Sequence, residues 1–226
     1  MSAIIEQLRG GLIVSCQADA DSPVYGPKFM AAFARCAEIA GAVGIRVNGP
    51  ADTRAVRKAV KLPILGIYKL RTEEYPVYIT PTLQSARQLV RAGADLIAID
   101  ATHRARQGNL PPETLIASIQ SKLGVPVMAD IDSLEEGLAA AAAGVDIVAT
   151  TMAGYTPARP KTDGPDLELL RALAERISTP IICEGRVGHP EDVRAALDAG
   201  AFAVVVGTAI TAPIAITKTF VQAAVR

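Results

Sequence analysis

The sequence predicts an α/β fold: one (β/α)8 barrel, or TIM barrel, that spans residues 1–226 as a single domain. Three observations support this prediction. Three apolar runs begin with proline and end in a charged residue, four more follow an alanine–glycine pair, and helical patterns separate the runs. Such alternation of strands and helices is typical of a parallel sheet covered by helices. A doubly wound open sheet is the alternative, although no Gly-x-Gly-x-x-Gly turn follows the first predicted strand.

Eight strands are expected, and each is short, apolar and bounded by proline or glycine. Gly41, Gly93, Gly144 and Gly200 recur about every fifty residues, and glycine readily adopts the left-handed conformation that ends a helix before a strand. The segments that carry the strands are residues 11–17, 40–47, 63–69, 92–100, 126–130, 142–150, 180–184 and 199–207.

Helical patterns fill the segments between these strands. One apolar helical face precedes Gly93 and consists of Leu83, Ala86, Leu89 and Val90. Ser133 and Glu136 form a capping-box pattern at the start of another helix. Residues 190–192 (PED) suit the first turn of a helix that ends at Gly200, because proline and acidic residues favour that position.

The composition argues against several classes of function. The 226 residues include 23 Lys and Arg and 23 Asp and Glu, and no Trp, so we expect no nucleic-acid partner. No stretch of eighteen apolar residues predicts a membrane span, and we expect no signal peptide. Cys16, Cys36 and Cys183 are expected to be free thiols, which favours a cytoplasmic location.

Charged residues at the ends of buried strands indicate an active site. Lys69, Asp130 and Glu184 each end a proline-led apolar run, and an ionised group there is costly unless it emerges into a polar site. In barrels of this class the carboxyl ends of the strands form the active-site face. The residues expected at this face are Gln17, Arg46, Lys69, Asp100, Asp130, Thr150, Glu184 and Gly207.

This set of residues contains no histidine. His103 and His189 fall in loops after the fourth and seventh strands, where surface or helix-capping roles are expected. A metal site usually needs converging histidines and carboxylates, so we predict none. No nucleophile-elbow sequence is present either, so a serine-type triad has no support.

The last two strands end in loops that suit a phosphate group. Gly185 and Arg186 follow the seventh strand, and Gly207 and Thr208 follow the eighth. Glycines let backbone N–H groups approach an anion, and barrels often bind phosphate at this place. The loop at residues 153–157, which contains Tyr155, is a candidate to close over a ligand or an ordinary surface loop.

Lys69 and Glu184 together suggest chemistry at a carbon acid. Burial and the nearby Arg46 would lower the pKa of Lys69, whereas Asp130 and Glu184 would oppose that effect. A neutral lysine can abstract a proton next to a carbonyl or form a Schiff base with it. Glu184 can act as a second acid or base, or position the lysine. The residues indicate a small phosphorylated carbonyl compound as the substrate class.

Nine short motifs, in order along essentially the whole chain, make the sequence resemble the N-acetylmannosamine-6-phosphate 2-epimerase family. They are residues 15–18 (SCQA), 44–49 (GIRVNG), 63–69 (PILGIYK), 78–82 (YITPT), 100–102 (DAT), 129–131 (ADI), 150–156 (TTMAGYT), 184–186 (EGR) and 207–211 (GTAIT).

The resemblance implies a cofactor-free barrel that interconverts N-acetylmannosamine 6-phosphate and N-acetylglucosamine 6-phosphate in amino-sugar and sialic acid breakdown. Lys69 would be the catalytic acid/base at sugar C2, with Glu184 as its partner. The family is commonly dimeric, so the resemblance also implies a homodimer. The residues expected to bind the substrate are Gln17, Arg46, Asp130, Tyr155, Gly185, Arg186, Gly207 and Thr208.

One position departs from the family pattern. Ala212 stands where relatives usually carry an arginine, so a ligand contact is lost unless a neighbour such as Lys218 replaces it. Two alternatives therefore stay open. One is a different phosphosugar epimerase or isomerase, and the other is a non-catalytic protein that only binds a sugar phosphate.

Overall fold

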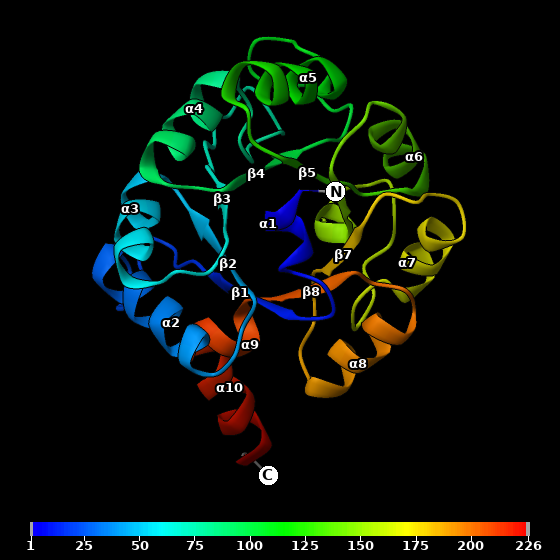
Figure 1. Cartoon of the computed structure of the whole chain (residues 1–226). Coiled ribbons are helices and arrows are strands. Elements are labelled where there is room, and N and C mark those ends of the chain that lie inside the picture. Colours follow the sequence, from blue (N-terminus) through cyan, green and yellow to red (C-terminus); the bar gives the residue numbers. More distant parts are fainter. Residues whose placement is uncertain (1, 225–226) are drawn as a thin grey trace.

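A computed structural model describes residues 2–224, and its eight parallel strands form one closed barrel in the order of the chain (Figure 1). Each strand pairs with the next one in sequence, and β8 closes the barrel against β1. The predicted (β/α)8 barrel is therefore confirmed. The strands are β1 Leu12–Cys16, β2 Gly44–Asn48, β3 Ile64–Ile67, β4 Leu96–Asp100, β5 Val127–Asp130, β6 Ile147–Ala149, β7 Ile181–Glu184 and β8 Ala203–Val206.

Helices surround the barrel and cover the outer faces of its strands (Figure 1). Their apolar faces pack on outward-facing strand residues in the larger of two hydrophobic clusters. The helices are α1 Ala3–Glu6, α2 Pro27–Ile39, α3 Pro50–Ala59, α4 Leu83–Ala92, α5 Pro112–Leu123, α6 Leu134–Ala142, η1 Thr150–Met152 (a 3-10 turn), α7 Leu167–Ala174, α8 Pro190–Asp198, α9 Thr208–Thr211 and α10 Pro213–Ala224.

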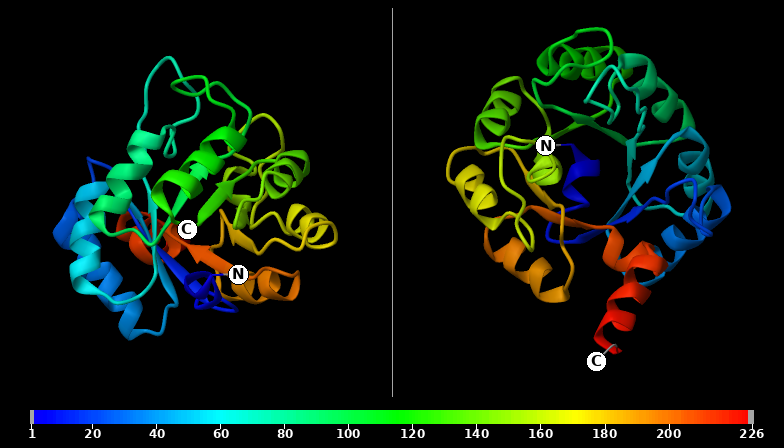
Figure 2. Two further views of the ribbon diagram at one scale, coloured as in Figure 1. Left: turned by 45° about the horizontal axis from the view of Figure 1, so that its top comes forward. Right: turned by 180° about the vertical axis from the view of Figure 1, so that it is seen from behind.

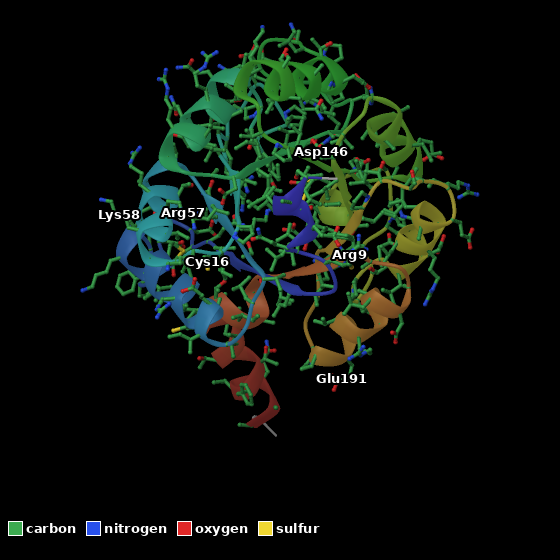
Figure 3. All side chains as sticks on the ribbon, viewed as in Figure 1. Arg9, Cys16, Arg57, Lys58, Asp146 and Glu191 are labelled. Carbon is green, nitrogen blue, oxygen red and sulfur yellow. The ribbon has the colours of Figure 1, made fainter. Side chains whose placement is uncertain are left out.

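The second hydrophobic cluster fills the inside of the barrel and includes side chains of the segment around α1. Ile5 and Leu8 are buried together with inward-facing strand residues such as Leu65 and Met128. Figures 1 and 2 show α1 lying across one end of the barrel. Arg9, labelled in Figure 3, lies 4.6 Å from the centroid of the Phe202 ring, which fastens this segment near β8. The N-terminal segment thus closes the end of the barrel opposite the predicted site.

The helix signals in the sequence are confirmed at most positions. The glycines before β2, β4, β6 and β8 all have positive φ, between 77° and 105°. Residues 190–192 open α8, and the predicted apolar face of α4 packs on the barrel. The capping box at Ser133 is only half formed. The Ser133 hydroxyl accepts the N–H of Glu136, but the Glu136 carboxylate binds His103 instead of returning to the helix start.

A segment after β3 folds back and extends the barrel at its carboxyl end. Ile79 forms an antiparallel bridge with Lys69, and the Thr80 N–H donates to the Tyr68 carbonyl at 2.8 Å. On the other side, the Asp100 N–H donates to the Ile79 carbonyl at 3.0 Å. The segment therefore lies between the ends of β3 and β4, whose direct pairing stops earlier.

The last helix, α10, projects outward from the barrel (Figure 1). It has no buried residue, although it carries the apolar side chains of Ile214, Phe220 and Val221. In chain order α10 takes the place of the eighth helix, which normally packs against the barrel. Within residues 2–224, no helix is both long and apolar enough to cross a membrane.

Candidate active site

Arg46 is the centre of the charged groups inside the carboxyl end of the barrel. It lies within β2, and its side chain is only 1% exposed. Its guanidinium binds the Asp130 carboxylate through two nitrogens, at 2.6 Å and 3.3 Å, and also binds Glu184. Asp130 and Glu184 are the last residues of β5 and β7, so the expected convergence of these strand ends is confirmed.

Burial and neighbouring charges shift the protonation of this cluster. Burial raises the pKa of Glu184 to about 7, an effect that Arg46 opposes and that Asp130 reinforces. Burial alone would lower the pKa of Arg46, but Asp130 and Glu184 together raise it, so the arginine stays charged. A carboxyl with a pKa near neutrality can both give and take a proton at physiological pH.

Lys69 approaches the same cluster from the end of β3. Its backbone N–H donates to the Asn48 side-chain oxygen at 2.9 Å, and its bridge to Ile79 fixes the other side of the chain. Burial and the positive charge of Arg46 lower the pKa of Lys69, while Glu184 opposes the shift. The amine is thus half-buried, close to a cation and more easily deprotonated than an ordinary lysine.

Two threonines in the turn after β6 also reach this cluster. Thr150 was expected at this face, whereas Thr151 was not among the predicted site residues. The Thr150 hydroxyl accepts the Glu184 N–H at 3.1 Å and donates to the Glu184 carbonyl at 3.0 Å. The Thr151 hydroxyl lies 2.7 Å from an Asp130 oxygen and 3.2 Å from a Glu184 oxygen. The contacts of Thr151 needed the fold to be seen, because 21 and 33 residues separate it from Asp130 and Glu184.

Gln17 lies just beyond β1, and its amide is only partly satisfied. Its nitrogen donates to the Ser15 hydroxyl at 2.6 Å, whereas its oxygen is buried without a partner in the described part of the chain. Nε of Arg46 is likewise buried and unpartnered. Buried polar atoms normally have hydrogen-bond partners, so these two atoms are candidates to meet a ligand or water.

Arg186, a predicted binding residue that follows β7, bonds to a neighbouring loop and not to the charged cluster. The Arg186 guanidinium donates to the carbonyls of Ala153 and Gly164, at 2.6 Å and 3.0 Å, and to the Thr162 hydroxyl. It also lies 5.3 Å from the centroid of the Tyr155 ring, which is largely exposed. The Arg186 side chain therefore holds the loop that precedes α7, and its hydrogen bonds are largely occupied there.

The loop after β8 contains the short helix α9. Gly207 precedes α9, Thr208 is its first residue and is exposed, and the Thr211 hydroxyl donates to the Ser15 carbonyl at 2.7 Å. Ala212 follows α9 directly. Lys218 lies on the projecting helix α10, so the idea that it replaces the missing arginine within one chain has no structural support.

Asp100, also expected at this face, belongs to a separate network. It is fully buried, accepts from Thr102 at 2.6 Å and from Arg104 at 2.7 Å, and has no hydrogen bond to the Arg46 cluster. Burial raises the pKa of Asp100, and its hydrogen bonds to Thr102 and the charge of Arg104 oppose this shift. Asp100 therefore organises the loop after β4.

The two histidines lie outside the Arg46 cluster. His189 is the N-cap residue of α8, and His103 lies between the carboxylates of Glu113 and Glu136. Both positions agree with the surface and capping roles that the sequence suggested. No group of three or more His, Cys, Asp or Glu side chains within residues 2–224 is arranged to hold a metal ion.

Comparisons with known proteins identify the family. Residues 30–226 match the family model described as "Putative N-acetylmannosamine-6-phosphate epimerase". The chain belongs to the N-acetylmannosamine-6-phosphate epimerase family. A family member from Caldanaerobacter subterraneus subsp. tengcongensis is 48% identical over 219 residues, which cover 96% of this chain and 92% of the relative. One from Thermosynechococcus vestitus is 52% identical over 205 residues, covering 91% and 89%. Both carry the name putative N-acetylmannosamine-6-phosphate 2-epimerase.

A solved structure of this epimerase family has the same fold. The N-acetylmannosamine-6-phosphate 2-epimerase from Clostridium perfringens superimposes with a TM-score of 0.94 at 40% identity, over 98% of this chain and 96% of that one. The thiamine phosphate pyrophosphorylase from Pyrococcus furiosus, at 16% identity and a TM-score of 0.63, shares the fold alone. The family suggested by the nine motifs is thereby confirmed.

Proposed function

We propose that this protein interconverts N-acetylmannosamine 6-phosphate and N-acetylglucosamine 6-phosphate by removing and returning the proton at C2 of the open-chain sugar. Membership of the epimerase family supports the reaction and its substrate class. The single observation that carries the proposal is the position of Lys69, whose pKa is lowered by burial and by Arg46, close to the buried Arg46–Asp130–Glu184 cluster. An amine in this setting suits proton abstraction beside a carbonyl.

Each group of the cluster has a role in the proposed mechanism. Neutral Lys69 takes the C2 proton of the aldehyde form and leaves an enolate-type intermediate across C1 and C2. Arg46 holds the carbonyl oxygen, because a fixed cation complements the negative charge that develops there. Asp130 holds a sugar hydroxyl, whose O–H its carboxylate accepts. Glu184, with a pKa of about 7, returns a proton on the opposite face or assists Lys69 in doing so.

The substrate phosphate is proposed to bind between the ends of β7 and β8. Gly185 has a φ of 105°, a conformation that favours glycine, and Gly207 precedes the start of α9. The backbone N–H groups near Gly185 and Arg186, with the exposed Thr208 hydroxyl, are suitable donors for phosphate oxygens. Tyr155 borders Gly185, and the Gln17 amide oxygen is an acceptor for a sugar hydroxyl.

Proton NMR in D2O tests the proposed reaction directly. Purified protein with N-acetylmannosamine 6-phosphate, without added metal or nucleotide, should form the gluco epimer with deuterium at C2. Turnover of another phosphosugar in a substrate panel, with no change in this one, would favour a different epimerase or isomerase. Binding of N-acetylmannosamine 6-phosphate without conversion or C2 exchange would favour a sugar-phosphate-binding protein.

We also propose that the protein is a cytoplasmic homodimer in which α10 of each chain docks on the other. The three free thiols suit a reducing compartment. A lone twelve-residue helix is marginally stable in water, and α10 buries none of its residues within one chain. Phe220 is 74% exposed, and Val221 and Ile214 are about half exposed. A second copy related by a twofold axis would cover both helices at once.

Substitution of the apolar face of α10 tests this assembly. The variant Phe220→Glu/Val221→Glu should elute as a monomer, because two charges would have to be buried in the proposed interface. Light scattering after size-exclusion chromatography measures the mass. The matched control is Ile39→Glu, which replaces another exposed apolar residue on α2 and should leave the dimer intact. An unchanged mass for the α10 variant would rule out this interface.

A further inference from the structure

Thr151 is an uncharged side chain that contacts all three members of the buried cluster, Arg46, Asp130 and Glu184. Its hydroxyl oxygen lies 2.7 Å from Asp130 Oδ1, 3.2 Å from Glu184 Oε2 and 3.4 Å from Arg46 Nη1. We propose that Thr151 is a positioning residue that orients the Glu184 carboxylate for proton transfer. The proposal rests on the epimerase function proposed above.

The hydroxyl of Thr151 cannot serve both carboxylates as a donor at once. It has one proton to donate and two lone pairs that accept. Arg46 supplies a donor to the oxygen, while Asp130 and Glu184 both present oxygens to the single proton. The direction of this one hydrogen bond therefore depends on which carboxyl is ionised. The Thr151 hydroxyl thus couples the hydrogen bonds of the Asp130 carboxyl on β5 and the Glu184 carboxyl on β7.

The turn that carries Thr151 is itself fixed to both neighbouring strands. The Met152 N–H donates to the Ile131 carbonyl at 3.1 Å, which ties the turn to the end of β5. Thr150 forms two hydrogen bonds with the backbone of Glu184, which tie it to β7. Consecutive threonines thus hold Glu184 in two places: Thr150 holds the main chain and Thr151 holds the carboxylate. A hydroxyl on so rigid a support can keep the carboxylate in one orientation.

The charge balance of the cluster gives Thr151 an effect on protonation. Burial is the main reason that the pKa of Glu184 is raised, and the hydrogen bond from Thr151 opposes that rise. Within residues 2–224, no other uncharged side chain forms hydrogen bonds with both carboxylates of the cluster. Removing the hydroxyl should therefore raise the pKa of Glu184 further and leave Arg46 to orient its carboxylate without the support of Thr151.

The variant Thr151→Val tests this role, because valine keeps the shape of threonine and lacks the hydroxyl. We expect kcat to fall about 10- to 100-fold, the usual range for losing a hydrogen bond to a charged group, with a smaller change in KM. The limb of the pH–rate profile that reports Glu184 should move to higher pH. Thr151→Ser keeps the hydroxyl and should restore most of the activity and the original profile.

Thr102→Val is the matched control. Thr102 also donates its hydroxyl to a buried carboxylate at a strand end, that of Asp100, but it has no contact with the Arg46 cluster. We expect a comparable loss of stability with activity and pH profile nearly unchanged. Wild-type kinetics in Thr151→Val, or equal losses in Thr151→Ser and Thr151→Val, would overturn the proposal.

A titration without substrate separates this proposal from the epimerase assignment. Protein labelled with ¹³C at glutamate carboxyls gives one resonance that disappears in Glu184→Gln and so belongs to Glu184. Its midpoint should move to higher pH in Thr151→Val and remain in place in Thr151→Ser. A wild type that fails to convert the sugar would refute the epimerase function, while this titration would still decide whether Thr151 controls Glu184. An unmoved midpoint in Thr151→Val would refute the proposed control.

Discussion

Lys69→Ala should lower kcat about 10²- to 10⁴-fold, the typical contribution of a positioned acid or base. The expected loss follows from the lowered pKa of Lys69 and its place beside the Arg46 cluster. The fold should persist, because the backbone contacts of Lys69 with Asn48 and Ile79 do not involve its side chain. Time-resolved NMR of C2 exchange in D2O measures the rate, and circular dichroism checks the fold.

Two comparisons sharpen the Lys69 experiment. Lys122→Ala removes an exposed lysine near the end of α5 and should retain wild-type rates. Borohydride added during turnover separates the two possible uses of the amine. Proton abstraction leaves the protein mass unchanged, whereas a Schiff base would be reduced to a stable adduct on Lys69. Near-normal activity of Lys69→Ala would contradict the assignment of this residue as the base.

Arg46→Met should be the most destabilising single change in the site, at about 3–5 kcal/mol, because it leaves two buried carboxylates without their cation. The Asp130 side chain is 0% exposed and that of Glu184 is 13% exposed, so water can replace little of the lost interaction. Chemical denaturation at pH 8 measures the change in the free energy of unfolding. Adding Asp130→Asn and Glu184→Gln to the Arg46→Met variant should recover much of the loss.

The destabilisation of Arg46→Met should depend on pH in a defined direction. The pKa of Glu184 is already raised in the folded protein, and Arg46 is the largest charge that opposes this rise. A carboxyl whose pKa is raised by folding lowers stability by an amount that grows as the pH rises above its unfolded pKa and is complete above its folded pKa. The gap between the variant and the wild type should therefore be larger at pH 8 than at pH 5.

A surface arginine provides the reference for the Arg46 measurement. Arg35 pairs with Glu38 on α2, with 57% of its side chain exposed, and such pairs contribute at most about 1 kcal/mol. Arg35→Met should thus change stability little at either pH. Equal effects of Arg46→Met and Arg35→Met would show that the buried cluster has no special role in stability.

Short-range patterns in the sequence were enough to predict the barrel. Proline-led runs and the glycines before four strands report on local conformation, so the eight strands appear where expected. The positions of Asp130 and Glu184 at the ends of β5 and β7 could also be predicted, because each ends a short apolar run. The direct contact between Arg46 and Glu184 could not be predicted from local patterns. They are 138 residues apart in the chain, and only closure of the barrel brings them together.

Three features could not be predicted because they depend on contacts outside the local segment. The segment around Ile79 pairs with Lys69 and β4 through its backbone, which leaves no side-chain pattern. Glu136 has the spacing of a capping box, but its carboxylate binds His103 instead. Arg186 resembles a phosphate ligand in sequence, yet its guanidinium is occupied by the loop before α7.

The backbone bonds at Lys69 and Glu184 determine which component must move during turnover. Asn48 and Ile79 fix the main chain at Lys69, and Thr150 fixes that of Glu184 from both sides. With both main chains held, any movement of these two residues is limited to their side chains, which does not carry either one around to the second face of a planar intermediate. Inversion at C2 then needs either two stationary groups on opposite sides or a sugar that turns about its own bonds while its phosphate stays anchored.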